Sequence, residues 1–366
     1  MTIPALLALR LAAQRIAPRS ESPQADGIAG CVRHLGAMQA QDYPAACAAI
    51  GLRTGATARD VEDALAQGRI VRTWPMRGTL HLVAAEDVRW MLALTAARVV
   101  ASDAARLQRQ FGIDERIAAR SAEALARALQ GGRRLTRTGA YEVLEAAGHA
   151  TAGSRGLHIL GLLAQQGVLC EGPREGRQPT FVLLDEWIAA TPALVRDDAL
   201  ALLAQRYFRS HGPATAADFA YWSGLTLGDA RNAVAAIAPQ LQSLDTDADP
   251  AWFAGDAEPP PATGARAHLL PAFDEYLIGY RDRRAVLAAR HAAQVISRNG
   301  LFSPVVLVDG QVAARWKTIM AGDTAVLAIA PLRSLRRADR AAVAAAARAH
   351  ARFLGMPVDI DIGPVG

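Results

Sequence analysis

The chain has 366 residues, of which 51% are hydrophobic and only 5% aromatic. This length is enough for two or three compact units, and an apolar fraction rich in Ala and Leu favours helices. The formal net charge of +5 is compatible with a nucleic-acid partner but is equally common in soluble enzymes. The N-terminal apolar run is short and interrupted by Arg10, which predicts neither a signal peptide nor a membrane span. We therefore expect a cytoplasmic protein with no membrane partner.

The metal-binding residue types show no recognised spacing. Cys31, Cys47 and Cys170 contain no Cys-x-x-Cys pair, and the eight histidines form no His-x-x-x-His or His-Glu-x-x-His motif. Three dispersed cysteines fit a reducing compartment without a disulfide framework. The sequence predicts no metal and no cofactor.

A succession of helices followed by a hairpin first occurs in residues 1–84. The pattern predicts helices over residues 4–16, after Asp26 and from Thr57, with Thr57 and Asp60 forming a capping box. Two strands follow at residues 69–74 and 79–83. Three helices and a hairpin are the order of a winged helix-turn-helix unit, which we predict here as the first of three.

The same order recurs twice without obvious residue identity. After a connecting helix in residues 85–112, a second unit is predicted at 113–190 and a third at 191–255. The second has a wing tip at Gly172–Pro179, and the third has an acidic tip at Asp245–Asp249, which would repel phosphates. The second and third units are built from the following predicted helices and hairpin strands: 113–129, 136–146 with Thr136 as its cap, 154–166, 168–171, 180–184, 196–210, 215–224, 226–237 and the hairpin 240–254.

Residues 256–366 differ in pattern and are predicted to form a mixed α/β domain. The stretch 255–265 is a linker by composition, and Asp309-Gly310 is a favoured two-residue hairpin turn. The predicted elements are strands at 268–271, 305–308, 311–316 and 325–329 and a final helix at 335–353. The fold class is mainly α with small β-hairpins (α+β): tandem winged helix-turn-helix units forming a curved scaffold, with a C-terminal mixed α/β cap.

Four segments, in this order, resemble the winged-helix DNA glycosylases of the AlkZ and YcaQ type. They are Met38–Pro44, Arg77–Val83, Leu270–Arg283 and residues 300–310. The resemblance covers nearly the whole chain. It implies tandem winged helices around a concave DNA channel and hydrolysis of the N-glycosidic bond of alkylated bases, with unhooking of interstrand crosslinks by some members.

The resemblance also implies a catalytic motif, Gln-hydrophobic-Gln or Gln-hydrophobic-Asp. This sequence carries Gln39-Ala40-Gln41, which matches the AlkZ branch. Glutamine is no general base, but its carbonyl can orient a water, and an N3- or N7-alkylated purine is already cationic and leaves without protonation. Pro44 limits helix continuation, so we place the motif at a helix end or in a loop. The alternative is that both glutamines are surface residues after a helix.

The scarcity of lysine indicates whether the enzyme also cleaves the DNA backbone. Glycosylases that also cleave the backbone use an amine that forms a Schiff base. Lys317 is the only lysine, so only Lys317 and the N-terminal amine could serve. Lys317 follows Trp316 in a predicted strand and has the character of a phosphate or surface contact. We expect a monofunctional glycosylase without lyase activity.

Other polar residues are supporting candidates with structural alternatives. Asp42 is either the base or a residue that solvates a helix terminus, and His81 is either a catalyst or a buried, hydrogen-bonded strand residue. The structural role is favoured for both.

Two acids followed by a tyrosine form a further candidate group. Asp274 and Glu275 precede Tyr276, and the pair could act in the site or pin Arg281 and Arg283 structurally. The second role is favoured.

The partner implied is double-stranded DNA, alkylated by preference, bound by a monomer. The cations expected to reach DNA are Arg77, Arg133, Arg134, Arg137, Arg174, Arg177 and Lys317. The alternative function is a non-catalytic winged-helix DNA-binding protein or transcriptional regulator, which would usually dimerise to read two half-sites.

Overall fold

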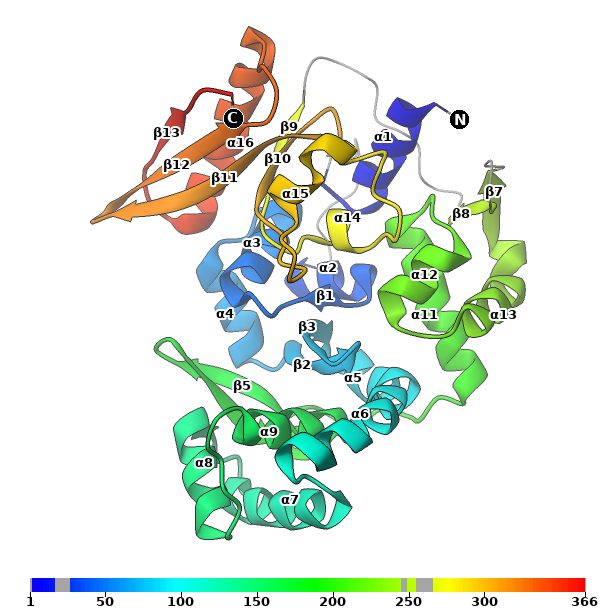
Figure 1. Cartoon of the computed structure of the whole chain (residues 1–366), viewed down its shortest axis with the longest axis vertical. Coiled ribbons are helices and arrows are strands. Elements are labelled where there is room, and N and C mark those ends of the chain that lie inside the picture. The colour runs from blue at the N-terminus through cyan, green and yellow to red at the C-terminus, as the bar shows by residue number, and fades with distance from the viewer. Residues whose placement is uncertain (1, 17–26, 245–248, 255–265, 366) are drawn as a thin grey trace. The chain divides into compact units, whose positions relative to one another are not determined.

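The computed structural model describes residues 2–16, 27–244, 249–254 and 266–365. The chain forms two compact units (Figure 1). One is continuous in sequence, Glu62–Leu200, and is called the inserted unit. The other combines Met1–Val61 with Ala201–Gly366 and is called the split unit.

The inserted unit is a helical layer on a small sheet. Its strands run in the spatial order β3–β2–β5–β6–β4, with β2–β3 and β5–β6 as antiparallel hairpins. Leu163 of α9 and Leu125 of α7 pack with Trp74 and Phe181 from the strands in one apolar core. The elements are β2 (Ile70–Met76), β3 (Thr79–Ala84), α5 (Val88–Met91), α6 (Ala97–Phe111), α7 (Glu115–Leu129), β4 (Leu135–Thr136), α8 (Arg137–Ala146), α9 (Arg155–Gln165), β5 (Leu169–Glu175), β6 (Gln178–Leu183) and α10 (Leu184–Trp187).

The first and middle parts of the split unit are mostly helical. The elements are α1 (Ile3–Ala13), α2 (Gly27–Leu35), β1 (Met38–Gln39), α3 (Tyr43–Thr54), α4 (Ala58–Ala66, which runs across the unit boundary), α11 (Arg196–His211), α12 (Ala216–Ser223), α13 (Leu227–Ile237), β7 (Leu241–Leu244) and β8 (Ala251–Ala254). Both α12 and α13 begin with a reciprocal capping box, at Thr215 and Thr226, which satisfies the free amides of the first turn.

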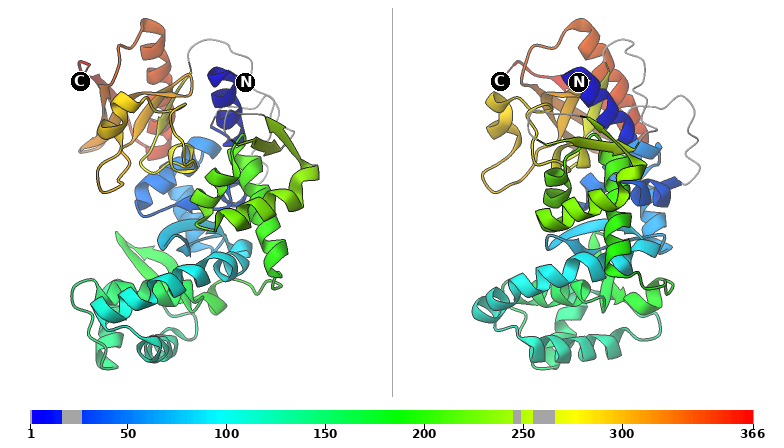
Figure 2. Two further views of the ribbon diagram at one scale, coloured as in Figure 1. Left: turned by 45° about the vertical axis from the view of Figure 1, so that its right-hand side comes forward. Right: turned by 90° about the vertical axis from the view of Figure 1, so that its right-hand side faces the viewer.

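The remainder of the split unit is a sheet between helices. Its strands run in the order β13–β12–β11–β10–β9, antiparallel except for the parallel β12–β13 pair, and α16 packs against β9 and α3 (Figures 1 and 2). The elements are β9 (Ala267–Leu270), α14 (Glu275–Ile278), α15 (Ala292–Val295), β10 (Val305–Val308), β11 (Gln311–Ala321), β12 (Thr324–Pro331), α16 (Arg337–Leu354) and β13 (Val358–Ile362).

Successive residues of the strands face opposite layers of this unit. Leu269 packs with Val343 of α16, whereas Leu270 packs with Leu7 of α1 and with Tyr276 of α14. The sheet thus carries α16 on one face and α1 with α14 on the other, so that the N-terminal segment and the C-terminal segment share one core.

Most of the predicted helices and strands are present, and the differences concern α3, the connecting helix and two strands of the C-terminal sheet. Helix α3 begins at Tyr43, so the expectation that Pro44 ends a helix is wrong; proline is favourable in a first turn, where its missing N–H is not needed. The connecting helix expected at 85–112 is interrupted by a π-helical segment at Leu92–Ala96. Strand β11 is longer than predicted, and β13 was not predicted.

The linker at 255–265 and most of the acidic tip (residues 245–248) lie outside the described residues. The division into three helix–hairpin units and a cap stays a prediction. No helix in the described ranges is both long and apolar enough to cross a membrane.

Candidate active site

Gln39 lies at the end of the two-residue strand β1, just before α3 begins. Asp42 caps this helix, because its carboxylate accepts a hydrogen bond from the Ala45 amide at 3.1 Å. Gln39 is buried, with 8% of its surface exposed, whereas Gln41 is exposed. Of the two glutamines in the motif, one is therefore buried and the other lies at the surface.

The two glutamine side chains contact each other. Gln39 Nε2 donates to Gln41 Oε1 at 3.0 Å, which leaves the Gln39 carbonyl oxygen pointing elsewhere. That oxygen, Oε1, is buried and accepts no hydrogen bond from any residue in the described part of the chain. An unsatisfied buried acceptor costs about 1–3 kcal/mol, so it favours a donor such as a bound water.

The carboxylate of Glu275, at the start of α14, contacts the backbone of Gln39. Its Oε1 accepts the Gln39 backbone N–H at 2.9 Å, and its Oε2 accepts the indole N–H of Trp222 at 2.9 Å. His211 Nε2 lies 3.5 Å from the same Oε2. Burial lowers the pKa of His211, and Glu275 opposes this effect only in part, so the imidazole favours its neutral form.

Asp274 forms a buried ion pair with Arg53 of α3. The guanidinium donates to both carboxylate oxygens, at 2.7 and 2.8 Å, and neither side chain is exposed. Burial alone would lower the pKa of Arg53, but Asp274 raises it above its usual value. The expectation that Asp274 pins Arg281 or Arg283 is wrong; Arg283 instead donates to backbone carbonyls and a tyrosine hydroxyl.

The side chains of Tyr276 and His81 each contact a backbone carbonyl of their own unit. The Tyr276 hydroxyl donates to the Gly310 carbonyl at 3.2 Å and ties α14 to the β10–β11 turn; burial raises its pKa. His81 belongs to the inserted unit, where its Nδ1 lies 2.8 Å from the Thr79 carbonyl oxygen. His81 is fully buried, as in the structural alternative.

Several predicted DNA-binding arginines come together at one part of the inserted unit. Arg134 Nε lies 3.1 Å from Glu175 Oε1, which joins the segment before α8 to the β5–β6 hairpin. Arg177 is exposed at the turn of that hairpin, and the half-buried Arg174 donates to its carbonyl. Arg137 is exposed at the first position of α8, which is capped by the preceding threonine as predicted.

The other predicted cations are dispersed. Arg133 donates to backbone carbonyls at the end of α7. Arg77 has φ of +54° in the β2–β3 turn, and its guanidinium lies 3.4 Å from His81 Nε2. Lys317 is exposed on β11 in the split unit.

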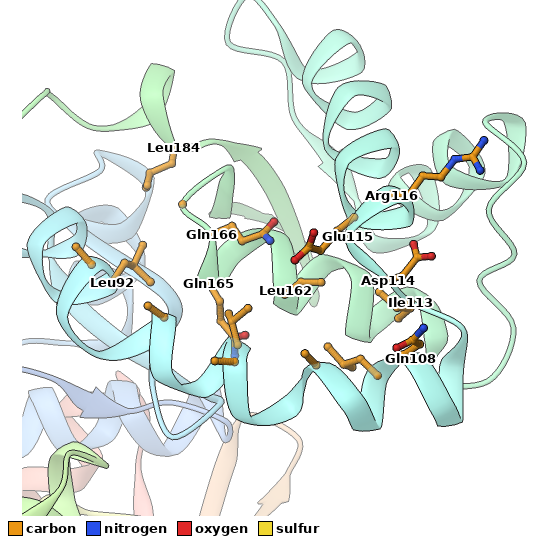
Figure 3. A pocket seen from close by; sticks show the side chains of 18 of the residues that line it. Leu92, Gln108, Ile113, Asp114, Glu115, Arg116, Leu162, Gln165, Gln166 and Leu184 are labelled. Atoms are coloured by element: carbon orange, nitrogen blue, oxygen red, sulfur yellow. The ribbon is translucent and has the colours of Figure 1, made fainter.

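A separate pocket of about 1120 Å³ lies in the inserted unit (Figure 3). Its walls are mainly apolar side chains of α6 and of the π-helical segment before it. Gln108, Gln165 and Gln166 also line it, as do Asp114 and Glu115 at the start of α7. None of the predicted catalytic residues lines it. Nowhere in the described ranges do three His, Cys, Asp or Glu side chains gather in a way that could hold a metal ion.

Arg53, His211 and Trp222 were not predicted from the sequence to lie at the site. Each lies in an ordinary helix, and the sequence separation from its partner, Asp274 or Glu275, is between 53 and 221 residues. No local pattern marks such contacts. A buried Trp, whose N–H needs an acceptor, was the one available signal.

The comparisons with known proteins place the chain among the DNA glycosylases. The family described as DNA glycosylase AlkZ-like matches residues 32–353, so the chain belongs to this family, as the resemblance implied. Among characterised proteins, it is 29% identical over 334 residues to the interstrand DNA cross-link repair glycosylase of Streptomyces sahachiroi, covering 86% of this chain and 87% of that protein. The solved structure of the Streptomyces sahachiroi DNA glycosylase AlkZ matches with a TM-score of 0.78 and 26% identity, covering 99% of this chain and 100% of the other.

Proposed function

We propose that this protein is a monofunctional DNA glycosylase that hydrolyses the N-glycosidic bond of cationic N3- or N7-alkylated purines. Gln39 and Gln41 are the residues proposed to position the attacking water. The observation that carries the proposal is the buried Gln39 carbonyl oxygen, which has no donor among the described residues although its amide nitrogen is held by Gln41. A water hydrogen satisfies this acceptor.

The proposed reaction needs no strong acid in the protein. The water donates one hydrogen bond to Gln39 Oε1 and attacks C1′ of the sugar as the bond from C1′ to the base breaks. The bonding electrons go to the base and neutralise its positive charge, and the water gives up a proton to solvent after it has bonded to C1′. Orientation of the water supplies the rate enhancement, together with stabilisation of the oxocarbenium-like sugar.

The proposal excludes strand cleavage through a lysine. Lys317, the only lysine in the sequence, is exposed on β11. A Schiff base at C1′ requires an amine at the reacting carbon. The expected product is therefore an abasic site in an unbroken strand.

DNA binding is proposed to use tandem winged-helix units with the chain acting as a monomer. Support comes from the helices followed by the hairpins β2–β3, β5–β6 and β7–β8. Arg137 and Arg177 are exposed beside one such hairpin and can contact phosphates. The name of the Streptomyces sahachiroi relative supports interstrand crosslinks as a further substrate.

The test is the single-turnover release of N7-methylguanine from alkylated duplex DNA. We expect Gln39→Ala and Gln41→Ala each to slow release by about 10²-fold, the loss typical of removing one positioning group from an active site. Gln108→Ala, in the separate pocket of the inserted unit, is the matched control and should release base at the wild-type rate. Undiminished release by both site variants would refute the assignment.

The same reactions distinguish the product and the class of protein. Gel analysis should show strand breaks only after alkaline treatment; breaks formed by the enzyme alone would contradict the monofunctional proposal. Tight binding to one intact sequence, with no base released from N3-methyladenine, N7-methylguanine or a nitrogen-mustard crosslink, would instead identify a regulator.

A further inference from the structure

The carboxylate of Glu275 joins three segments of the split unit that are far apart in sequence. It belongs to α14, accepts the backbone N–H of Gln39 in β1, and accepts the indole N–H of Trp222 in α12. We infer that Glu275 is a positioning residue for Gln39, and that Trp222 fixes the carboxylate in the required orientation. The inference rests on the proposed function, because it assigns Glu275 a role only through Gln39.

The two hydrogen bonds use different oxygens and so define the plane of the carboxylate. Oε1 is held at 2.9 Å from the Gln39 nitrogen and Oε2 at 2.9 Å from the indole nitrogen. Glu275 is only 1% exposed, so solvent does not compete for these donors.

We call the Glu275 carboxylate, with its hydrogen bonds to Gln39 and Trp222, the clamp. The clamp acts on the backbone at the point where the Gln-Ala-Gln motif begins. The side chain of Gln39 is held by Gln41 and its main chain by Glu275, so the free carbonyl oxygen has a defined place. Active-site groups must be held within about 0.5 Å of their productive position, and an error of about 1 Å can reduce the rate about 10²-fold.

The neighbours of the clamp restrict its movement. Asp274, the preceding residue, is fixed by the bidentate contact with Arg53. The ring of Trp222 lies against Gly36, where an added Cβ would come within 3.3 Å of the indole, and Gly36 has φ of +80°. The same indole therefore contacts the turn that leads into β1 and the carboxylate that holds Gln39.

Glu275 is assigned a positioning role and not a chemical one. Both carboxylate oxygens already accept hydrogen bonds from protein groups, and Oε2 also has His211 Nε2 at 3.5 Å. A general base must have an oxygen available to the water that it deprotonates. The effect of Glu275 on the rate should consequently disappear when the Gln39 side chain is absent.

A double-mutant cycle on the full chain tests this dependence. The variants are Glu275→Gln, Gln39→Ala, the combination of both, and Trp222→Phe. The measured quantities are the single-turnover rate of N7-methylguanine release, the Kd for alkylated duplex and the thermal midpoint. Glu123→Gln, an exposed residue of α7, is the matched control and should behave as the wild type.

Glu275→Gln is expected to slow release by about 10- to 100-fold with a Kd within about twofold of the wild type. The amide of the new glutamine has one nitrogen, which is a donor. This nitrogen would face either the backbone N–H of Gln39 or the indole N–H of Trp222, and one of the two hydrogen bonds would be lost. Trp222→Phe, which keeps an aromatic ring but removes the N–H, should slow release by about 3- to 10-fold. The combined variant should be no slower than Gln39→Ala.

A wild-type rate in Glu275→Gln, beside a slow Gln39→Ala, would overturn the inference alone. The inference also fails if Glu275→Gln slows Gln39→Ala by the same factor as it slows the wild type, because the two residues then act independently. If Glu275→Gln does not fold, a wild-type rate in Trp222→Phe with a native thermal midpoint overturns it. Wild-type release by Gln39→Ala would refute the proposed function and the inference with it.

Discussion

Replacing Arg53 by methionine should strongly destabilise the split unit. Methionine fills part of the same volume but leaves Asp274 as a buried carboxylate without its guanidinium partner, in a place where both side chains are fully buried. The substitution also removes the hydrogen bonds from Arg53 to the Gln14 and Ala49 carbonyl oxygens. Removal of one partner from a buried ion pair costs about 3–5 kcal/mol, most of it from the charge left behind.

This loss corresponds to a fall of about 6–20 °C in the thermal midpoint, since about 1 kcal/mol shifts the midpoint of a domain of 150–250 residues by about 2–4 °C. Differential scanning calorimetry of the full chain measures it. Arg127→Ala is the control, because Arg127 forms an exposed pair with Glu123 at 4.0 Å, and such pairs contribute about 0.5 kcal/mol or less. A midpoint for Arg53→Met within about 2 °C of the wild type would show that the buried pair is not what holds α3 to α14.

Three further predictions concern single residues. Burial lowers the pKa of His268 to about 4, so between pH 6.5 and 4 the unfolded chain binds a proton that the native chain does not. The free energy of unfolding should therefore fall as the pH drops from 6.5 to 4, and it should fall less steeply in His268→Gln. Urea midpoints at pH 4.5 and 7.5 measure this difference. Gly310→Ala should cost about 2 kcal/mol or more, because φ is +79° and the new Cβ would meet Leu7 Cβ at 2.8 Å. Gly322→Ala, at φ of +63° with open space around it, should lose only about 1 kcal/mol in the same melting experiment, and an equal loss in both variants would refute the steric argument. Arg177→Ala should reduce the slope of log K against log salt by about 1 in fluorescence polarisation with duplex DNA; an unchanged slope would remove Arg177 from the interface.

Turns and helix caps, which depend on residues close together in the sequence, were predicted correctly. The Asp309-Gly310 pair has φ of +50° and +79°, as its hairpin turn requires, and Thr57 and Thr136 form the predicted caps. Helix α3 was missed because Pro44 was interpreted as a stop, although Asp42 before it was a sufficient start signal.

The site was only partly predictable because its geometry depends on distant segments. The resemblance to a family directed attention to Gln39 and Gln41, but their mutual contact and the burial of only one of them depend on tertiary packing. The partner of Asp274 lies 221 residues earlier, whereas the sequence suggested the arginines nearest to it. A pattern in a single chain carries no information on pairs at that separation.

The division of the split unit into two pieces of sequence has a consequence for how the protein is made. Gln39 leaves the ribosome long before Glu275 does, and the whole inserted unit is synthesised between them. The inserted unit can complete its own core in that interval. Apolar side chains of the N-terminal helices, such as Leu7, stay uncovered during this time, because their partners on β9 and α14 have not been synthesised. A nascent chain therefore holds the amides without the clamp, and the site is assembled only at the end of translation.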